Sequence, residues 1–170
     1  MSDSFGISYG GRSAEDLFIS LTGAERVAKA ALGDAVLEGR HIEIKRASSS
    51  TLNQVRAVKY LTLVVHHSPT NSWYVVPAHV VVLLVSRRLR GQHTENPFES
   101  ATINLSRLSA YRLDDATQLR DRTLAAIEES DKYPELRELM DQVLLESKNL
   151  AQDSIMRVRQ LLKQLGLTAE

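Results

Sequence analysis

Two carboxylates and a lysine stand at a spacing that could support phosphodiester chemistry. Asp34 opens a short apolar segment, and Glu43 and Lys45 follow it nine and eleven residues later. Residues two apart in a strand share a face, and a turn at 38–39 would fold Asp34 back beside that face. Paired carboxylates suit Mg²⁺ or Mn²⁺, and a neighbouring ammonium can orient a water or stabilise developing charge. A metal site with such a cation is suited to hydrolysing a phosphodiester.

The hydrophobic pattern predicts the elements that must position these residues. Apolar residues at helical spacing predict a helix over 13–32, capped by Ser13 and ended by Gly33. The alternation of Ile42 and Ile44 with polar neighbours predicts a hairpin over 34–47. The further predicted elements are a helical or bridging segment at 52–59, strands at 60–65 and 73–76, a helix at 78–88, a polar loop at 91–100 and a strand at 101–105. For 78–88, composition also permits a buried strand.

The last third of the sequence is helical in character. One helix is predicted over 114–129, and Pro134 fits the first turn of the next. Apolar residues continue at a helical period to Leu165, as one long helix or as two with a break near Asn149. This tail could pack on its own chain or associate with a second copy.

Composition excludes several classes of protein. The 170 residues contain no cysteine, which excludes disulfide scaffolds, thiolate zinc sites and cysteine nucleophiles. Absence of cysteine fits a reducing compartment, and the N-terminus lacks a secretory pattern, so we expect a cytoplasmic protein. The apolar run at 78–85 is too short to span a bilayer, so no membrane partner is expected. The net charge is zero, which argues against a protein that coats nucleic acid regardless of its sequence. The N-terminal portion is basic and the C-terminal tail is acidic.

Asp34 and the run Glu43-Ile44-Lys45, preceded by a helix that carries Glu15, resemble the PD-(D/E)xK nuclease superfamily. This superfamily includes restriction and homing endonucleases, junction resolvases and repair nucleases. The resemblance covers about residues 12–105. Gly33 stands where many members have proline, at a position that varies in the family.

The resemblance implies an α/β fold with a restriction-endonuclease-like core: a helix, a mixed central sheet, a second helix and a further strand. Residues 1–112 would form this core, and residues 113–170 a helical extension that serves packing or dimerisation. Asp34, Glu43, the carbonyl of Ile44 and Glu15 would bind Mg²⁺, with Mn²⁺ as a substitute, and Lys45 would position the attacking water.

Two polar stretches could contact DNA, because hydroxyl, amide and guanidinium groups bind phosphates and read base edges. The candidates are Ser48, Ser49, Asn53, Gln54, Arg56, Arg87, Arg88 and Arg90. A helix cap with a solvated turn explains the first stretch equally well. A solvated helix end explains the arginines equally well, since cations are favourable there.

These observations together predict a Mg²⁺-dependent, site-specific endonuclease of restriction or homing type. It would cut double-stranded DNA as a homodimer with one site for each strand. The alternatives are a junction or repair nuclease, a non-catalytic DNA-binding module with a nuclease-like fold, and an assembly protein whose helical tail is the functional part. A solvated strand face would explain Glu43 and Lys45 without any chemistry.

Overall fold

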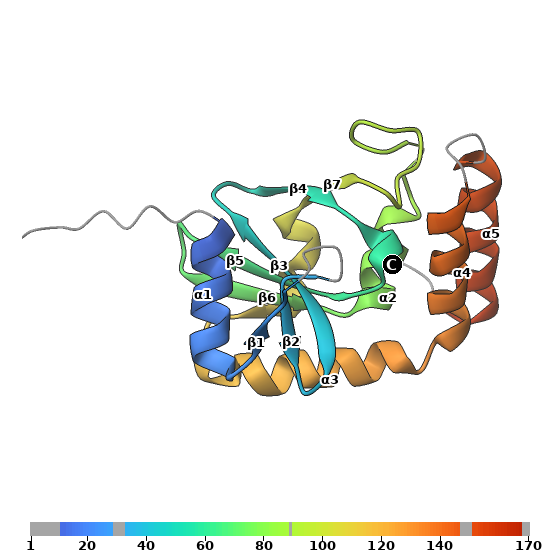
Figure 1. Ribbon diagram of the computed structural model, residues 1–170. Helices are drawn as coiled ribbons and strands as arrows, with labels where there is room; N and C mark the ends of the chain where they lie inside the picture. Colours follow the sequence, from blue (N-terminus) through green and yellow to red (C-terminus); the bar gives the residue numbers. More distant parts are fainter. Residues whose placement is uncertain (1–10, 29–32, 89, 147–150, 168–170) are drawn as a thin grey trace, which may run out of the picture.

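A computed structural model describes residues 11–28, 33–88, 90–146 and 151–167. Its centre is a six-stranded sheet in the order β1-β2-β3-β5-β6-β8, with helices on both sides (Figure 1). The strands are β1 Glu25–Arg26, β2 Ala35–Leu37, β3 Arg40–Ala47, β5 Thr62–His67, β6 Ser72–Val76 and β8 Arg112–Leu113. Only β3 and β5 pair in parallel. The predicted mixed α/β class is confirmed.

Helices cover the two faces of this sheet in unequal layers. The helices are α1 Gly11–Thr22, α2 Ala78–Val85, α3 Leu119–Asp131, α4 Pro134–Leu145 and α5 Ala151–Gln164. Residues of α1 and α3 share one hydrophobic core with β2 and β3. Residues of α2, α4 and α5 share a second core with β5, β6 and a separate two-stranded ribbon of β4 Thr51–Val55 and β7 Ala101–Asn104. The described residues also form three short 3₁₀ helices: η2 Ala57–Lys59, η3 Leu105–Tyr111 and η4 Ala116–Gln118.

The alternation of β3 decides which side of the sheet carries the charged residues. Ile42 and Ile44 are buried in the core formed with α1 and α3. Ala47 is buried in the core on the other side. Since strand side chains alternate, Glu43 and Lys45 point to the side of α2 and the ribbon, as Ala47 does.

The helix predicted over 13–32 is wrong at both ends. It begins at Gly11 rather than after a Ser13 cap, and it ends at Thr22. Gly23 has a φ of 74°, and its N–H donates to the carbonyl of Ile19 at 2.9 Å, a conformation that favours glycine and closes the helix. The chain then enters β1. Residues 29–32 lie outside the described part of the chain.

The segment 52–59 is mostly extended. Leu52 pairs with Ile103 of β7 and both are buried, so tertiary pairing overrides the helical alternative, and only η2 is helical. The helix predicted over 78–88 is confirmed for 78–85, against the buried-strand alternative. The strand expected from Tyr60 begins at Thr62, because Tyr60 adopts a left-handed φ of 49°.

The tail forms separate helices that pack on the rest of the chain. The helix predicted from 114 begins at Leu119, because Asp115 first caps η4 by accepting from the N–H of Thr117. Beyond it, α4 and α5 replace one long helix, and the break expected near Asn149 lies outside the described residues. Met140 and Val158 are fully buried in the core beside α2. These contacts show the tail packed on its own chain and do not test association with a second copy, so the homodimer stays a prediction. In the described part of the chain, no helix has the length and apolar character needed to cross a membrane.

Candidate active site

A tight hairpin brings the two predicted carboxylates together. Leu37 faces Arg40 at its end, and the two residues between them have positive φ values, 49° at Glu38 and 76° at Gly39. Two left-handed residues in a two-residue loop form the turn that matches the natural twist of paired strands. The Glu-Gly pair therefore fixes the register of β2 on β3.

Gly33 determines how the chain enters this hairpin. Its φ is 114°, and a Cβ atom there would lie 2.9 Å from the carbonyl oxygen of Ile42. No other residue fits without movement, and proline is excluded because its ring holds φ near −65°. The backbone at this position therefore requires glycine and excludes proline. The close approach lets the N–H of Asp34 donate to the Ile42 carbonyl at 2.8 Å.

The carboxylate of Asp34 is held against the neighbouring strand. Its Oδ2 accepts a hydrogen bond from the N–H of Ile44 at 2.7 Å. Asp34 therefore contacts β3 on both sides of Glu43, through its own N–H to Ile42 and through its side chain to Ile44. The expected neighbourhood of Asp34 and Glu43 is present in the structure, and the Ile44 carbonyl belongs to the same residue that Asp34 contacts.

Glu43 is the centre of a small cluster of charges. Its Oε1 lies 3.8 Å from Nζ of Lys45, and its Oε2 lies 3.1 Å from Nζ of Lys59 in η2. The exposed fractions of the Glu43, Lys45 and Lys59 side chains are only 14, 21 and 16%. These values exclude the alternative of a solvated strand face.

Burial is the main influence on the ionisation of Asp34. It raises the pKa of the Asp34 carboxyl, and the hydrogen bond from Ile44 opposes that shift. The negative charge of Glu43 raises the pKa further, while Lys59 and Lys45 lower it. A cation bound beside Asp34 would favour its ionised form and so oppose the rise in its pKa.

The donor set fits a magnesium ion that retains part of its water shell. Mg²⁺ is commonly bound through one or two carboxylates and several waters, and Asp34 and Glu43 supply two carboxylates on adjoining strands. Within the described ranges, no group of three or more acidic, histidine or cysteine side chains is arranged to hold a metal. Glu15 of α1 instead lies 3.4 Å from Arg26 of β1.

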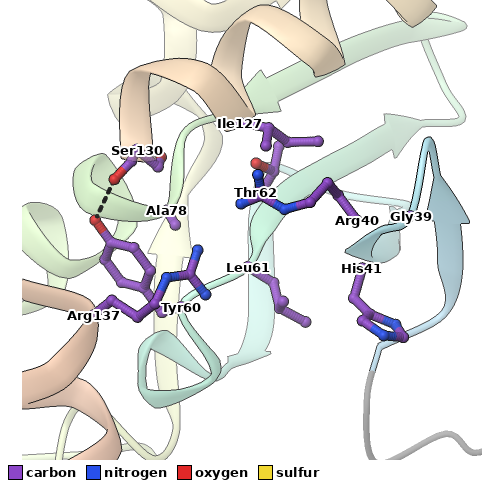
Figure 2. A pocket seen from close by; sticks show the side chains of 10 residues that line it. All are labelled: Gly39, Arg40, His41, Tyr60, Leu61, Thr62, Ala78, Ile127, Ser130 and Arg137. Carbon is purple, nitrogen blue, oxygen red and sulfur yellow. Dashed lines mark hydrogen bonds between the residues drawn. The ribbon is translucent and has the colours of Figure 1, made fainter. Parts of the chain in front are cut away.

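A small pocket of about 110 Å³ lies where β3 and β5 begin, next to η2 (Figure 2). Tyr60, which directly follows Lys59, donates from its hydroxyl to the carbonyl of Ser130 at 3.1 Å. The guanidinium of Arg137 lies over the Tyr60 ring, 4.9 Å from its centre. These contacts with α3 and α4 anchor the end of η2, and with it the backbone that carries Lys59.

The first group of DNA-contact candidates lies along the loop 48–50 and the ribbon. Ser48 and Ser49 are exposed. The Asn53 side chain accepts from Thr102 at 3.2 Å, and the Gln54 N–H donates to Gln92 at 2.9 Å. Arg56 donates to the backbone of Glu99 at 3.3 Å. The contact of Asn53 joins the two strands of the ribbon, and those of Gln54 and Arg56 tie the ribbon to the loop 91–100.

The second group lies at the end of α2. Arg87 and Arg88 line a pocket there together with Arg107 of η3, and Arg90 is exposed beyond them. The two groups of candidates are thus on different elements.

Sequence reasoning missed Lys59 and Arg107. Lys59 is the one charged residue in Ala57-Val-Lys-Tyr60, and its position before a strongly apolar strand was the only available signal. Arg107 lies in a short 3₁₀ segment with no motif around it. Comparison with models of known families, with curated proteins and with solved structures found no match for the chain.

Proposed function

We propose that this protein is a divalent-metal-dependent DNA endonuclease of the PD-(D/E)xK type, with Asp34, Glu43 and Lys45 as its catalytic residues. One observation carries the proposal: the two carboxylates and the lysine converge on adjoining strands while largely withdrawn from water. The order of helix α1, a mixed sheet and helix α2 supports a restriction-endonuclease-like core, whereas the strand after α2, β7, pairs with β4 in the separate ribbon and does not join the central sheet.

The roles follow from the chemistry of each side chain. Asp34 and Glu43 would provide the oxygens that hold the metal, with the Ile44 carbonyl beside them. The metal, when bound, neutralises phosphate charge and favours formation of the nucleophile. Lys45 orients the water and stabilises the charge that develops on the phosphate. The water oxygen forms a bond to phosphorus as the bond to the 3′ oxygen breaks, and a proton passes to that oxygen, leaving a 5′-phosphate and a 3′-hydroxyl.

A cleavage assay tests the proposal. Wild-type protein is incubated with a plasmid, a long linear duplex and a four-way junction, each with Mg²⁺, Mn²⁺ or EDTA. We expect metal-dependent cleavage that falls by about 10²-fold or more in Lys45→Ala and Asp34→Asn. Arg122→Gln, an exposed substitution on α3, is the matched control and should cut normally. Discrete duplex fragments support a site-specific enzyme, and cutting confined to the junction supports a resolvase.

The second candidate is a DNA-binding module without catalysis. Its support is that Lys59 and Lys45 already neutralise Glu43, as they would in a purely structural ion cluster. Calorimetric titration with Mn²⁺ separates the two. Folded wild-type protein that neither binds Mn²⁺ nor cuts any substrate contradicts the nuclease proposal and favours the module.

A further inference from the structure

We propose that a basic strip formed by α2, η3 and α5 binds the phosphodiester backbone of duplex DNA. The basic strip is defined as Arg87, Arg88, Arg107, Arg159 and Lys163. The inference deepens the proposed function, because it adds a substrate-binding surface to the candidate active site, and it rests on that function for the identity of the polymer.

Two adjacent pockets bring these cations together. The first, of about 390 Å³, is lined by Arg87, Arg88 and Arg107 with Leu84 and Ile103. The second, of about 520 Å³, shares Arg87 with the first. The residues that line the second pocket also include Arg159 and Lys163 of α5.

Neither pocket has an acidic residue among its linings. The whole chain has equal numbers of acidic and basic residues, so this strip is a local segregation of charge. Pocket walls that carry several cations attract a polyanion, and arginine is the residue best shaped to bind phosphate through two parallel hydrogen bonds.

Hydrogen bonds to the backbone hold two of the arginines in place. Arg88 donates from Nη2 to the carbonyl of Thr102 at 2.6 Å, which links the end of α2 to β7. Arg159 donates from Nε to the carbonyl of Ser86 at 2.6 Å. Each guanidinium has five N–H donors, so these bonds position the groups and leave donors for phosphate.

Arg159 also offsets the partial negative charge at the C-terminal end of α2. The C-terminal end of a helix carries partial negative charge that would repel a phosphate near Arg87 and Arg88. Arg159 binds a carbonyl in the terminal turn of α2 and places a positive charge there. The acidic tail therefore contributes cations to this surface, which its net charge conceals.

The basic strip lies on the same side of the sheet as the candidate active site. Residues of α2, η3 and α5 belong to the core on that side. The alternation of side chains along β3 points Glu43 and Lys45 to it as well. One duplex could therefore be held by the strip from the side on which the scissile phosphate must enter. The partly buried side chain of Leu84, which lines the first pocket, would contact the sugars.

The test measures binding without cleavage. Full-length protein carrying Lys45→Ala, in EDTA, is titrated into a fluorescent 20-base-pair duplex at several salt concentrations, with fluorescence anisotropy as the readout. The strip variant is Arg87→Gln with Arg107→Gln, two exposed residues. The control variant is Arg122→Gln with Lys132→Gln, which changes net charge equally at exposed positions of α3 and its C-cap.

We expect the strip variant to bind about 10-fold more weakly near 100 mM salt, with the slope of log Kd against log salt reduced by about 2. The control variant should stay within about twofold of the parent. Equal affinities of strip and control variants would overturn the proposal. So would absence of duplex binding by the parent, or binding of poly-L-glutamate in its place, which would indicate an acidic protein partner.

The outcome separates the strip from the nuclease proposal. Selective loss of duplex affinity in the strip variant, with no cleavage by wild type, retains the strip and rejects the nuclease. Metal-dependent cleavage by wild type, with strip and control variants binding alike, rejects the strip alone.

Discussion

Lys59 is expected to compete with the metal for Glu43. Its Nζ lies 3.1 Å from Oε2 of Glu43, and both side chains are mostly buried. At an effective dielectric constant of 20, a pair at this distance attracts by about 5 kcal/mol before desolvation is subtracted. Lys45 remains 3.8 Å from the same carboxylate when Lys59 is removed, and desolvation offsets part of the attraction. A net cost of about 1.4 kcal/mol for displacing Lys59 from Glu43 corresponds to a tenfold weaker binding of the metal.

The perturbation is Lys59→Met, which keeps the length of the side chain and removes its charge. We expect Mn²⁺ to bind about 10-fold more tightly than to wild type, because the metal no longer displaces an ion pair. Isothermal titration calorimetry at low salt measures the affinity. Lys59→Arg retains the charge and should bind near the wild-type value, and Glu43→Gln should bind weakly.

The result that refutes this reasoning is a folded Lys59→Met protein that binds Mn²⁺ as wild type does, or more weakly. Lys59 would then orient the carboxylate for the metal rather than compete with it. Near-ultraviolet circular dichroism of each variant establishes that the core is intact, so weak binding cannot be attributed to unfolding.

Four further predictions concern the site, the core and the helical tail. Asp34→Asn should raise the free energy of unfolding at pH 7 by about 0.5 kcal/mol, a modest gain because solvent partly screens this half-buried carboxylate. Burial raises the pKa of Asp34, so its ionisation destabilises the fold as the pH rises above the usual carboxyl range. Urea unfolding should therefore show no gain from the substitution near pH 3. His79 is buried and its pKa is lowered by burial, so stability should fall as the pH drops below about 6.5, and His79→Leu should flatten that dependence in thermal melts. Met140→Ala should cost about 2–4 kcal/mol in urea unfolding, since Met140 is fully buried. For the same reason, a fragment ending at residue 112 should lack a cooperative melt; a folded fragment that still cut DNA would show that the tail is accessory.

The hairpin that carries the candidate site could be predicted from the sequence because its determinants are local. Alternation around Ile42 and Ile44 defines a strand face, and the Glu38-Gly39 pair provides the two left-handed positions of the turn. These features suffice to bring Asp34 toward Glu43 and to set Glu43 and Lys45 on one face. The position of 78–88 directly after a strand that ends at Pro77 likewise allowed α2 to be predicted, although propensity also permitted a strand.

The segment 52–59 was predicted wrongly because its conformation depends on a partner far along the chain. Thr51–Val55 is a strand because β7 pairs with it from about fifty residues away, and no local pattern encodes that partner. The first helix ends early because Gly23 adopts positive φ, while the apolar spacing continues past it. Local periodicity reports which face of a segment is apolar, and tertiary pairing then determines the conformation that uses it.

The sequence by itself determined the acid–acid–lysine spacing and its likeness to a nuclease family. Only the tertiary structure decided that Glu43 and Lys45 are largely buried, that Lys59 lies against Glu43, and that the backbone at Gly33 leaves no room for a Cβ atom. It also decided that cations from α2, η3 and an acidic tail gather in one strip. The physical reason is that burial and electrostatic neighbourhood arise from packing between distant segments, whereas spacing along a strand is a property of the local chain.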